Sequence, residues 1–525
     1  MTTRPDIEAL NAAADHGMVA AFWAAADAGA PAILSPHGNR TRGELNANAN
    51  RLTRALSARG VQPGDGVALM CANRPEFAET IVAAQRAGLR LTPINWHLTA
   101  EEAGYILDDC EATAFVADAR FASIAAGAAA LAPRLRARLA VGGEIPGFEA
   151  WEKALAPESG DDVSATRAGS MMLYTSGTTG RPKGVHRPGE ARGALAAAQL
   201  TRYRGDTHVH LCTGPLYHAA PLAFSLTTPM AMGTPVVLMD GWEAEPTLAL
   251  IEHHGVTHTH MVPTMFHRLL SLPDATKARY DTSSLVFVIH GAAPCPIAVK
   301  QQLIDWLGPI VWEYYAATEG AGTLVGSEEW LAKPGTVGKV SPPDHIRILD
   351  ESGSEVAPGT VGTVYLKSPA ERFEYFKAPE KTAGAYRDTH FTLGDVGYVD
   401  DDGYLFLTDR SAHLIISAGV NIYPAEVEAA LLGHWAVGDV GVVGRPDEEW
   451  GEVVVAAVEP QPGVIPSDAL AAELVEWCRD RIAHYKCPRE VVFVEALPRH
   501  DNGKLYKHQL REQLRGDQER PNGNL

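Results

Sequence analysis

Helix and strand patterns alternate along most of this chain, and the alternation constrains the fold more than any other feature. Residues 41–60 carry four apolar side chains at helical spacing and end at a glycine. A Pro-Gly turn then leads into a short apolar strand, and residues 77–96 continue with another helix and strand. Alternation of this kind is typical of parallel sheets covered by helices, so we expect an α/β fold.

The pattern changes twice along the sequence. Residues 149–167 are polar, as in a linker, and the alternation then resumes up to about residue 349. Residues 359–406 consist of short β runs separated by turns, which predicts a small β-rich subdomain. Beyond residues 409–413, a helical segment, a strand pair and an amphipathic helix predict a small α+β domain of its own.

Composition narrows the range of functions. The 525 residues include 45 Lys and Arg against 64 Asp and Glu, a formal net charge of −19, which argues against a nucleic-acid partner. Six scattered cysteines form no C-x-x-C pair, so we expect neither a zinc site nor a disulfide framework. No stretch approaches the roughly 18 apolar residues of a membrane span. We therefore expect a cytoplasmic protein without an integral membrane segment, whose oligomeric state the sequence does not indicate.

The most informative segment is YTSGTTGRPKGV, residues 174–185, which follows an apolar strand. Its glycines allow the backbone to approach a ligand closely, its hydroxyls donate hydrogen bonds, and Lys183 supplies a positive charge. It departs from the Walker pattern because Gly184, not Ser or Thr, follows the lysine. The segment predicts a loop that binds a polyphosphate through these residues: Thr175, Ser176, Gly177, Thr178, Thr179, Gly180 and Lys183.

The same string resembles the phosphate loop of the adenylate-forming superfamily, which contains acyl-CoA synthetases, peptide-synthetase adenylation domains and firefly luciferase. Further motifs of that superfamily follow in the family order. They are PLYH (215–218), HGAAP (290–294), EYYAATEG (313–320), FTLGDVGY (391–398), LTDR (407–410), ISAGVNIYPAEVE (416–428) and PRHDNGK (498–504).

The resemblance covers nearly the whole chain and implies both a fold and a reaction. The fold would be a large N-terminal domain (1–409) of parallel-sheet subdomains plus a distorted β-barrel, followed by a small mobile α+β domain (410–525). In the reaction, ATP and a carboxylic acid give an acyl-adenylate and pyrophosphate, and the thiol of CoA then displaces AMP. The implied ligands are ATP, Mg²⁺, the acid and CoA.

The resemblance also assigns roles to residues around the phosphates. Lys504 would bridge the acid and the α-phosphate, where two anions must be brought together. Thr318 would bond the α-phosphate, and Glu319 would bind Mg²⁺, which needs only a carboxylate or two beside phosphate oxygens. His218 would gate the acyl pocket.

Nucleotide and thiol recognition follow in the same way. Tyr315, with the backbone of Gly291, Ala292 and Ala293, would form the adenine slot, whereas we expect neighbouring Tyr314 in the core. Asp395 and Arg410 would contact the ribose, and Gly419 and Trp450 would lie at the tunnel for the pantetheine arm of CoA. The histidines of HHGVTHTH (253–260) lack the H-E-x-x-H spacing, so we do not expect a metal there.

Three choices stay open. The acid is expected to be long-chain or bulky and polycyclic, because small residues occupy the predicted pocket positions. The acceptor is CoA or a carrier protein, unless the enzyme stops at the adenylate; a luciferase-type oxygenase or a nucleotide-binding protein without catalysis are the remaining alternatives. The hinge departs from the family pattern, with Ala412 and His413 where charged residues are usual.

Overall fold

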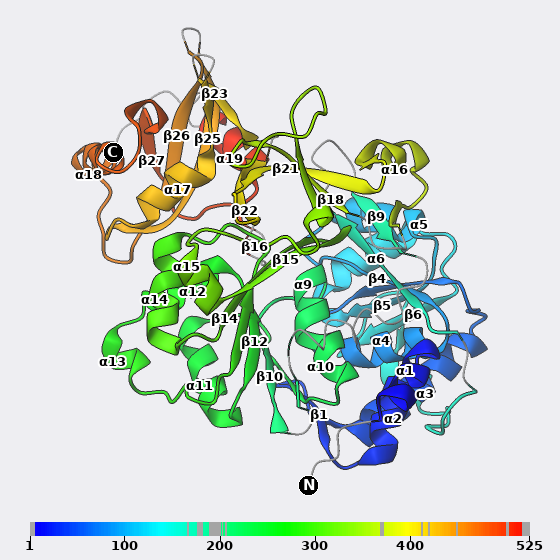
Figure 1. Cartoon of the computed structure of the whole chain (residues 1–525). Helices are drawn as coiled ribbons and strands as arrows, with labels where there is room; N and C mark the ends of the chain where they lie inside the picture. Colours follow the sequence, from blue (N-terminus) through cyan, green and yellow to red (C-terminus); the bar gives the residue numbers. More distant parts are fainter. Residues whose placement is uncertain are drawn as a thin grey trace, which may run out of the picture.

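The computed structural model places two large mixed sheets side by side, a smaller antiparallel sheet above them, and a fourth sheet in the C-terminal part (Figure 1). It describes residues 6–164, 167–175, 182–187, 201, 203–204, 207–367, 372–410, 413–417, 420–447, 450–499, 503 and 505–516. In this part of the chain, no helix combines the length and the apolar character needed to cross a bilayer.

The first large sheet is mostly parallel, with an antiparallel strand at each edge. Its strands in spatial order are β15 (Gly320–Gly326), β14 (Val311–Ala317), β13 (Phe287–His290), β12 (His258–Met261), β10 (His210–Cys212), β11 (Val236–Leu238), β1 (Pro31–Leu34) and β2 (Arg40–Thr41). The helices that follow these strands are α9 (Ala219–Leu222), a π-helical turn (Ala223–Thr227), α10 (Thr228–Ala231), α11 (Ala244–His254), α12 (Pro263–Leu270), α13 (Asp274–Lys277), α14 (Ile297–Leu307) and α15 (Ser327–Ala332).

The second large sheet is also largely parallel. Its strands in order are β19 (Glu374–Tyr375), β9 (Lys183–His186), β8 (Ser170–Thr175), β4 (Arg90–Pro93), β3 (Gly66–Met70), β5 (Ala112–Asp118), β6 (Ala137–Val141) and β7 (Glu149–Ala150). Its antiparallel pairings, β9 with β8 and β19 with β9, both lie at one edge. The first seven helices of the chain are α1 (Ile7–Asp15), α2 (Val19–Ala26), α3 (Arg42–Ala58), α4 (Pro75–Arg86), α5 (Ala100–Asp109), α6 (Ala122–Ala130) and α7 (Trp151–Leu155). Helix α3 begins at a Thr41 capping box and buries Leu45, Leu52 and Leu56, as its spacing predicts.

The smaller sheet is antiparallel along its main path, as the short β runs predict. Its strands are β16 (Gly338–Lys339), β22 (Tyr404–Arg410), β21 (His390–Val399), β18 (Gly362–Lys367), β17 (Ile346–Leu349) and β20 (Tyr386–Arg387), with α16 (Pro379–Ala385) nearby. This sheet curls into a half-barrel over its own apolar core, which includes Phe373 and Phe391.

The C-terminal elements form a separate α+β unit, orange to red in Figure 1. Strands β24 (Val420–Ile422), β23 (Ile415–Ser417), β26 (Gly451–Pro460), β25 (Val437–Asp447) and β27 (Glu490–Phe493) pack with α17 (Pro424–Leu432), α18 (Asp468–Arg479) and α19 (Lys507–Gly516). The α/β class, the half-barrel and this small unit are therefore confirmed. The division at residues 409/410 stays a prediction.

One local expectation was wrong. Residues 149–167 are polar in sequence, but β7 and α7 occupy residues 149–155, and Trp151 is only 4% exposed. The segment is anchored because its few apolar side chains join the core beneath α3, which a local polarity pattern does not reveal.

Candidate active site

The two ends of the predicted phosphate loop (residues 174–185), which we call the phosphate-type loop, meet near one edge of the second sheet. Thr175 ends β8, Lys183 begins β9, and the two are register partners in an antiparallel pair. This pairing brings the two ends of the phosphate-type loop together. Ser176, Gly177, Thr178, Thr179 and Gly180 lie outside the described residues, whereas Thr175 and Lys183 line a large cavity.

Thr318 and Glu319 form the two-residue tip of the hairpin between β14 and β15, closed by the pair Ala317–Gly320. Both side chains belong to residues that line the same cavity. The Arg187 guanidinium donates to the Thr318 carbonyl at 2.7 Å and so fixes the tip against β9. A Cβ at Gly320 would lie 2.5 Å from Phe391 Cζ, so only glycine allows the hairpin to pack this closely on the half-barrel.

Tyr375 connects the two charged side chains of the site. Its hydroxyl donates to Glu319 Oε1 at 3.0 Å, and Lys183 Nζ lies 4.9 Å from its ring centroid. Burial, followed by the charge of Glu319, raises the pKa of Tyr375, so the phenol stays protonated and keeps its role as a donor. A cation and a carboxylate are thus held beside one cavity without neutralising each other directly.

Tyr315 and Asp395 lie next to this wall. The Tyr315 hydroxyl donates to Asp395 Oδ2 at 2.6 Å, and both residues are less than a tenth exposed. Asp395 is also the strand partner of Arg410 across β21 and β22. Within the described part of the chain, the cavity contacts their neighbours Ala316, Thr392 and Leu393 instead.

The turn after β13 contains the other predicted adenine-slot residues. Ala292 lines the cavity with φ of 66°, an unusual value for a residue with a side chain. A Cβ at Gly291 would lie 2.5 Å from the Tyr314 ring. Ala293 follows in the same turn and does not line the cavity of the described structure.

His218 precedes α9 and lines the cavity, with the Tyr217 ring 4.3 Å away between centroids. Asn73 holds the chain that leads to it: its amide donates to the carbonyls of Gly214 and Met239, both at 3.0 Å, and it accepts from Leu216 N at 3.0 Å. Asn73 comes from the second sheet and His218 from the first. The position of His218 therefore depends on contact between the two sheets.

Two of the histidines in residues 253–260, His258 and His260, are hydrogen-bonded within the protein. His258 is bonded to Thr257 and to the Thr201 carbonyl, while His260 Nε2 lies 3.0 Å from the Tyr314 hydroxyl. Burial lowers the pKa of His258 and of His260 to about 3, so both rings are neutral at pH 7. No three metal-ligating side chains converge among the residues that the structure describes.

The cavity is continuous and has a volume of about 1040 Å³. Tyr506 and Gln509 of the C-terminal unit line it together with the hairpin tip, Thr175 and Lys183. Gly503 lies against the start of α12, where a Cβ would come within 2.6 Å of Thr264 Oγ1, and its φ is 78°. The C-terminal unit therefore covers the cavity in this structure.

Three remaining predicted residues lie elsewhere or cannot be placed. Trp450 stacks beneath the Arg489 guanidinium at 3.9 Å and does not line the cavity of the described chain. Lys504 and Gly419 lie outside the described residues, although Lys504 follows Gly503 directly. Tyr375, Arg187 and Asn73 were missed, because each acts through contacts between segments far apart in the sequence.

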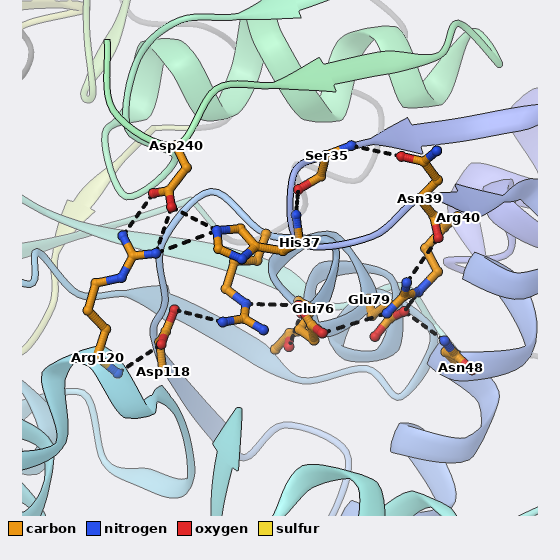
Figure 2. Close-up of polar contacts among 12 residues, drawn as sticks. Ser35, His37, Asn39, Arg40, Asn48, Glu76, Glu79, Asp118, Arg120 and Asp240 are labelled. Carbon is orange, nitrogen blue, oxygen red and sulfur yellow. Dashed lines mark hydrogen bonds and ion pairs between the residues drawn. The ribbon is translucent and has the colours of Figure 1, made fainter. Parts of the chain in front are cut away.

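A polar network joins the two large sheets at the ends of β1, β5 and β11 (Figure 2). The Arg120 guanidinium donates hydrogen bonds to both carboxylate oxygens of Asp240, at 2.8 and 2.6 Å. Asp240 Oδ2 also lies 2.7 Å from His37 Nε2. Hydrogen bonding by Arg120 lowers the pKa of Asp240 to about 2. In the same view, buried Glu79 accepts hydrogen bonds from Arg40 and Asn48.

Two family models match the chain: "AMP-binding enzyme" over residues 21–375 and "AMP-binding enzyme C-terminal domain" over residues 426–504. A fatty acid–[acyl-carrier-protein] ligase from Streptomyces coeruleorubidus is 34% identical, with 93% of this chain and 94% of that protein covered. A feruloyl-CoA synthase from an Amycolatopsis species is 35% identical, covering 91% and 96%.

Solved structures agree with this result. The ATP-bound MatB from Rhodopseudomonas palustris superposes with a TM-score of 0.81 at 29% identity, over 95% of this chain and 99% of that one.

Proposed function

The chain belongs to the AMP-binding enzyme family of AMP-forming acid–thiol ligases, and from this premise we propose that it converts a carboxylic acid into its CoA thioester through an acyl-adenylate. In the first step a carboxylate oxygen attacks the α-phosphorus of ATP, and the bond to pyrophosphate breaks. In the second step the thiol of CoA loses its proton, attacks the acyl carbon and displaces AMP.

One observation carries the proposal: Lys183, Thr318 and Glu319 converge on one cavity, with Tyr375 between the two charges. In-line transfer at phosphorus needs fixed positive charge and donors around oxygens that gain charge. Lys183 and the residues of its loop hold the phosphates, Thr318 donates to the α-phosphate, and Lys504 bridges acid and phosphate.

Glu319 is the proposed Mg²⁺ ligand. Its carboxylate accepts from Tyr375, and Glu319 lines the same cavity as Lys183 and Thr175, which fits a cation that takes one or two carboxylates and phosphate oxygens. The metal would neutralise phosphate charge. Tyr315, Ala292 and the backbone of Gly291 and Ala293 form the adenine side, with Asp395 and Arg410 at the ribose.

On the thiol side, His218 separates acid from thiol, and Gly419 and Trp450 border the pantetheine arm. Trp450 lies away from the cavity here, so this role requires the C-terminal unit to rotate before the second step.

The relatives support a second acceptor. The Streptomyces coeruleorubidus protein is a ligase for an acyl carrier protein, and the chain resembles it as strongly as it resembles CoA ligases. Loading of a carrier protein is therefore the alternative to CoA.

Pyrophosphate release tests the proposal. ATP, Mg²⁺ and a panel of aliphatic, aryl and polycyclic acids are supplied with no thiol, with CoA, or with a phosphopantetheinylated carrier protein. We expect acid-dependent release that rises with CoA and yields a thioester detectable by mass. If pyrophosphate release rose only with the carrier protein, the carrier protein and not CoA would be the acceptor. ATP binding without release with any acid would reject adenylation.

A further inference from the structure

The cavity extends well beyond the residues that handle phosphate. Its far part is lined by Val19, Ala20 and Trp23 of α2, Ile81 and Val82 of α4, and Met171 of β8. We call these six residues the tail compartment. They come from the N-terminal helices and the second sheet, and in Figure 1 helix α2 lies at the opposite end of the molecule from the C-terminal unit, which contributes Tyr506 and Gln509 to the cavity lining.

Strand β8 is the wall that connects the two ends. Five of the six residues of β8 line the cavity: Ser170, Met171, Leu173, Tyr174 and Thr175. Met172 is the exception and is fully buried in the core. Four residue steps separate Thr175 from Met171, which at about 3.3 Å per residue gives a wall of about 13 Å. A ligand joined to the α-phosphate near Thr175 must therefore be extended to reach the tail compartment.

The compartment offers mainly hydrocarbon to a ligand. The polar groups at its base are engaged by the protein itself: the Trp23 indole donates to the Ala231 carbonyl at 3.0 Å, and Arg42 donates to the Gly233 carbonyl at 2.6 Å. The Arg42 guanidinium also lies 5.1 Å from the Trp23 ring. Gln85 of α4 also lines the cavity, but the six residues of the compartment present alanine, valine, isoleucine and methionine side chains and the Trp23 ring, which favour an apolar tail.

We propose that the acid carries a long, extended aliphatic tail, which runs along β8 away from the phosphates and ends in the tail compartment, where Ala20 determines the longest chain accepted. This inference rests on the proposed function and decides between its two acid classes. A flexible chain follows a narrow strand wall into a pocket between α2 and α4, whereas a rigid fused-ring acid would fill the space next to His218 and leave the compartment empty.

Ala20→Phe tests the inference by filling the compartment. Pyrophosphate release is measured with straight-chain acids from six to eighteen carbons, kept below their micelle concentrations, with benzoate as a single-ring acid and with polycyclic acids. In the unsubstituted enzyme kcat/KM should rise with chain length. In Ala20→Phe it should fall by about tenfold or more for the longest acids, since even two excluded methylenes forfeit that much binding, while acids of six carbons stay within about twofold.

The matched control is Ala25→Phe, on the same helix but exposed to solvent, which should leave the chain-length profile unchanged. Ala20→Leu should give a chain-length profile between those of the unsubstituted enzyme and Ala20→Phe. Because leucine is smaller than phenylalanine, this variant keeps the inference testable if Ala20→Phe does not fold. ATP affinity, measured by calorimetry, should be the same in all variants because the nucleotide lies at the other end of the cavity.

Two kinds of result are distinguished by this design. Equal profiles for Ala20→Phe and Ala25→Phe, with strong release from long acids, would overturn the inference and leave the adenylation reaction intact. Release from a polycyclic acid but from no straight-chain acid would also overturn the inference. Absence of release from every acid in the unsubstituted enzyme, polycyclic acids included, would reject the proposed function instead.

Discussion

At the scale of single residues, Tyr375 gives the site its separation of charge. Its ring lies beside Lys183 and its hydroxyl bonds Glu319, so the lysine and the carboxylate stay available to a ligand and do not pair with each other. The residue has no motif of its own in the sequence. Its importance follows only from β19 pairing with β9, which brings it beside the end of the phosphate-type loop.

Tyr375→Phe keeps the ring and removes the hydrogen bond to Glu319. We expect kcat for pyrophosphate release to fall by about tenfold, the usual effect of losing a bond to a charged group, and the Mg²⁺ concentration for half-maximal rate to rise.

Tyr404→Phe is the control, because Tyr404 donates to Glu329 at 2.9 Å in the same way but away from the cavity. Equal kinetic losses in both variants would contradict a specific role for Tyr375.

At the scale of elements, the β14–β15 hairpin places Thr318 and Glu319, and its geometry depends on the glycine that follows them. Gly320→Ala would drive a methyl group into the Phe391 ring. We expect the variant to lose about 1–3 kcal/mol of stability, as overpacked cores do, and to release pyrophosphate much more slowly because the tip is displaced.

Gly384→Ala supplies the comparison. A Cβ there meets nothing within 4 Å, and the residue lies in α16, so alanine should be neutral or stabilising. Urea unfolding and pyrophosphate release measure both variants. Full activity in Gly384→Ala together with full activity in Gly320→Ala would show that the hairpin tolerates displacement.

The elements also show how far sequence reasoning reached. Helix α3 and the β25–β26 pair were predictable because caps and periodic apolar residues are local signals. Helix α7 was not, since Trp151 is buried only through contacts with distant segments. The same distinction between local and long-range signals applies to the site. Sequence motifs identified Lys183, Thr318 and Glu319, whereas the extension of the cavity to α2 depends on packing between the sheets.

At the scale of the whole molecule, the two large sheets are joined by polar contacts, of which the Asp240–Arg120 ion pair, with His37 beside it, is the clearest (Figure 2). The pKa of Asp240 is lowered from 3.8 to about 2, so the pair stabilises the fold above pH 4, and the contribution is lost as the pH falls through about 2.

Asp240→Asn should therefore lower the free energy of unfolding at pH 7 by about 1 kcal/mol, after allowance for solvent screening, and the difference from the unsubstituted protein should shrink towards pH 3. Asp274→Asn, in an exposed pair with Lys277, should change little at either pH. A difference for Asp240→Asn that is independent of pH would show that packing, not charge, is responsible.

Movement of the C-terminal unit concerns the molecule as a whole. Ala412 lies outside the described residues, at the predicted hinge. We expect Ala412→Pro to spare adenylate formation and to slow thioester formation by about tenfold, because a fixed φ restricts rotation between the two steps. Pyrophosphate exchange and thioester mass report the two half-reactions, with Ala412→Gly as the control. Equal loss of both would place the hinge elsewhere.

The cover that Gly503, Tyr506 and Gln509 place over the cavity has a consequence for the lifetime of the intermediate. An acyl-adenylate is a mixed anhydride that water destroys. While the C-terminal unit lies on the cavity mouth, bulk solvent has little access to that anhydride. The enzyme would then retain the acyl-adenylate between its two reactions. Hydrolysis of the acyl-adenylate would be confined to the interval between movement of the C-terminal unit off the cavity and arrival of the thiol.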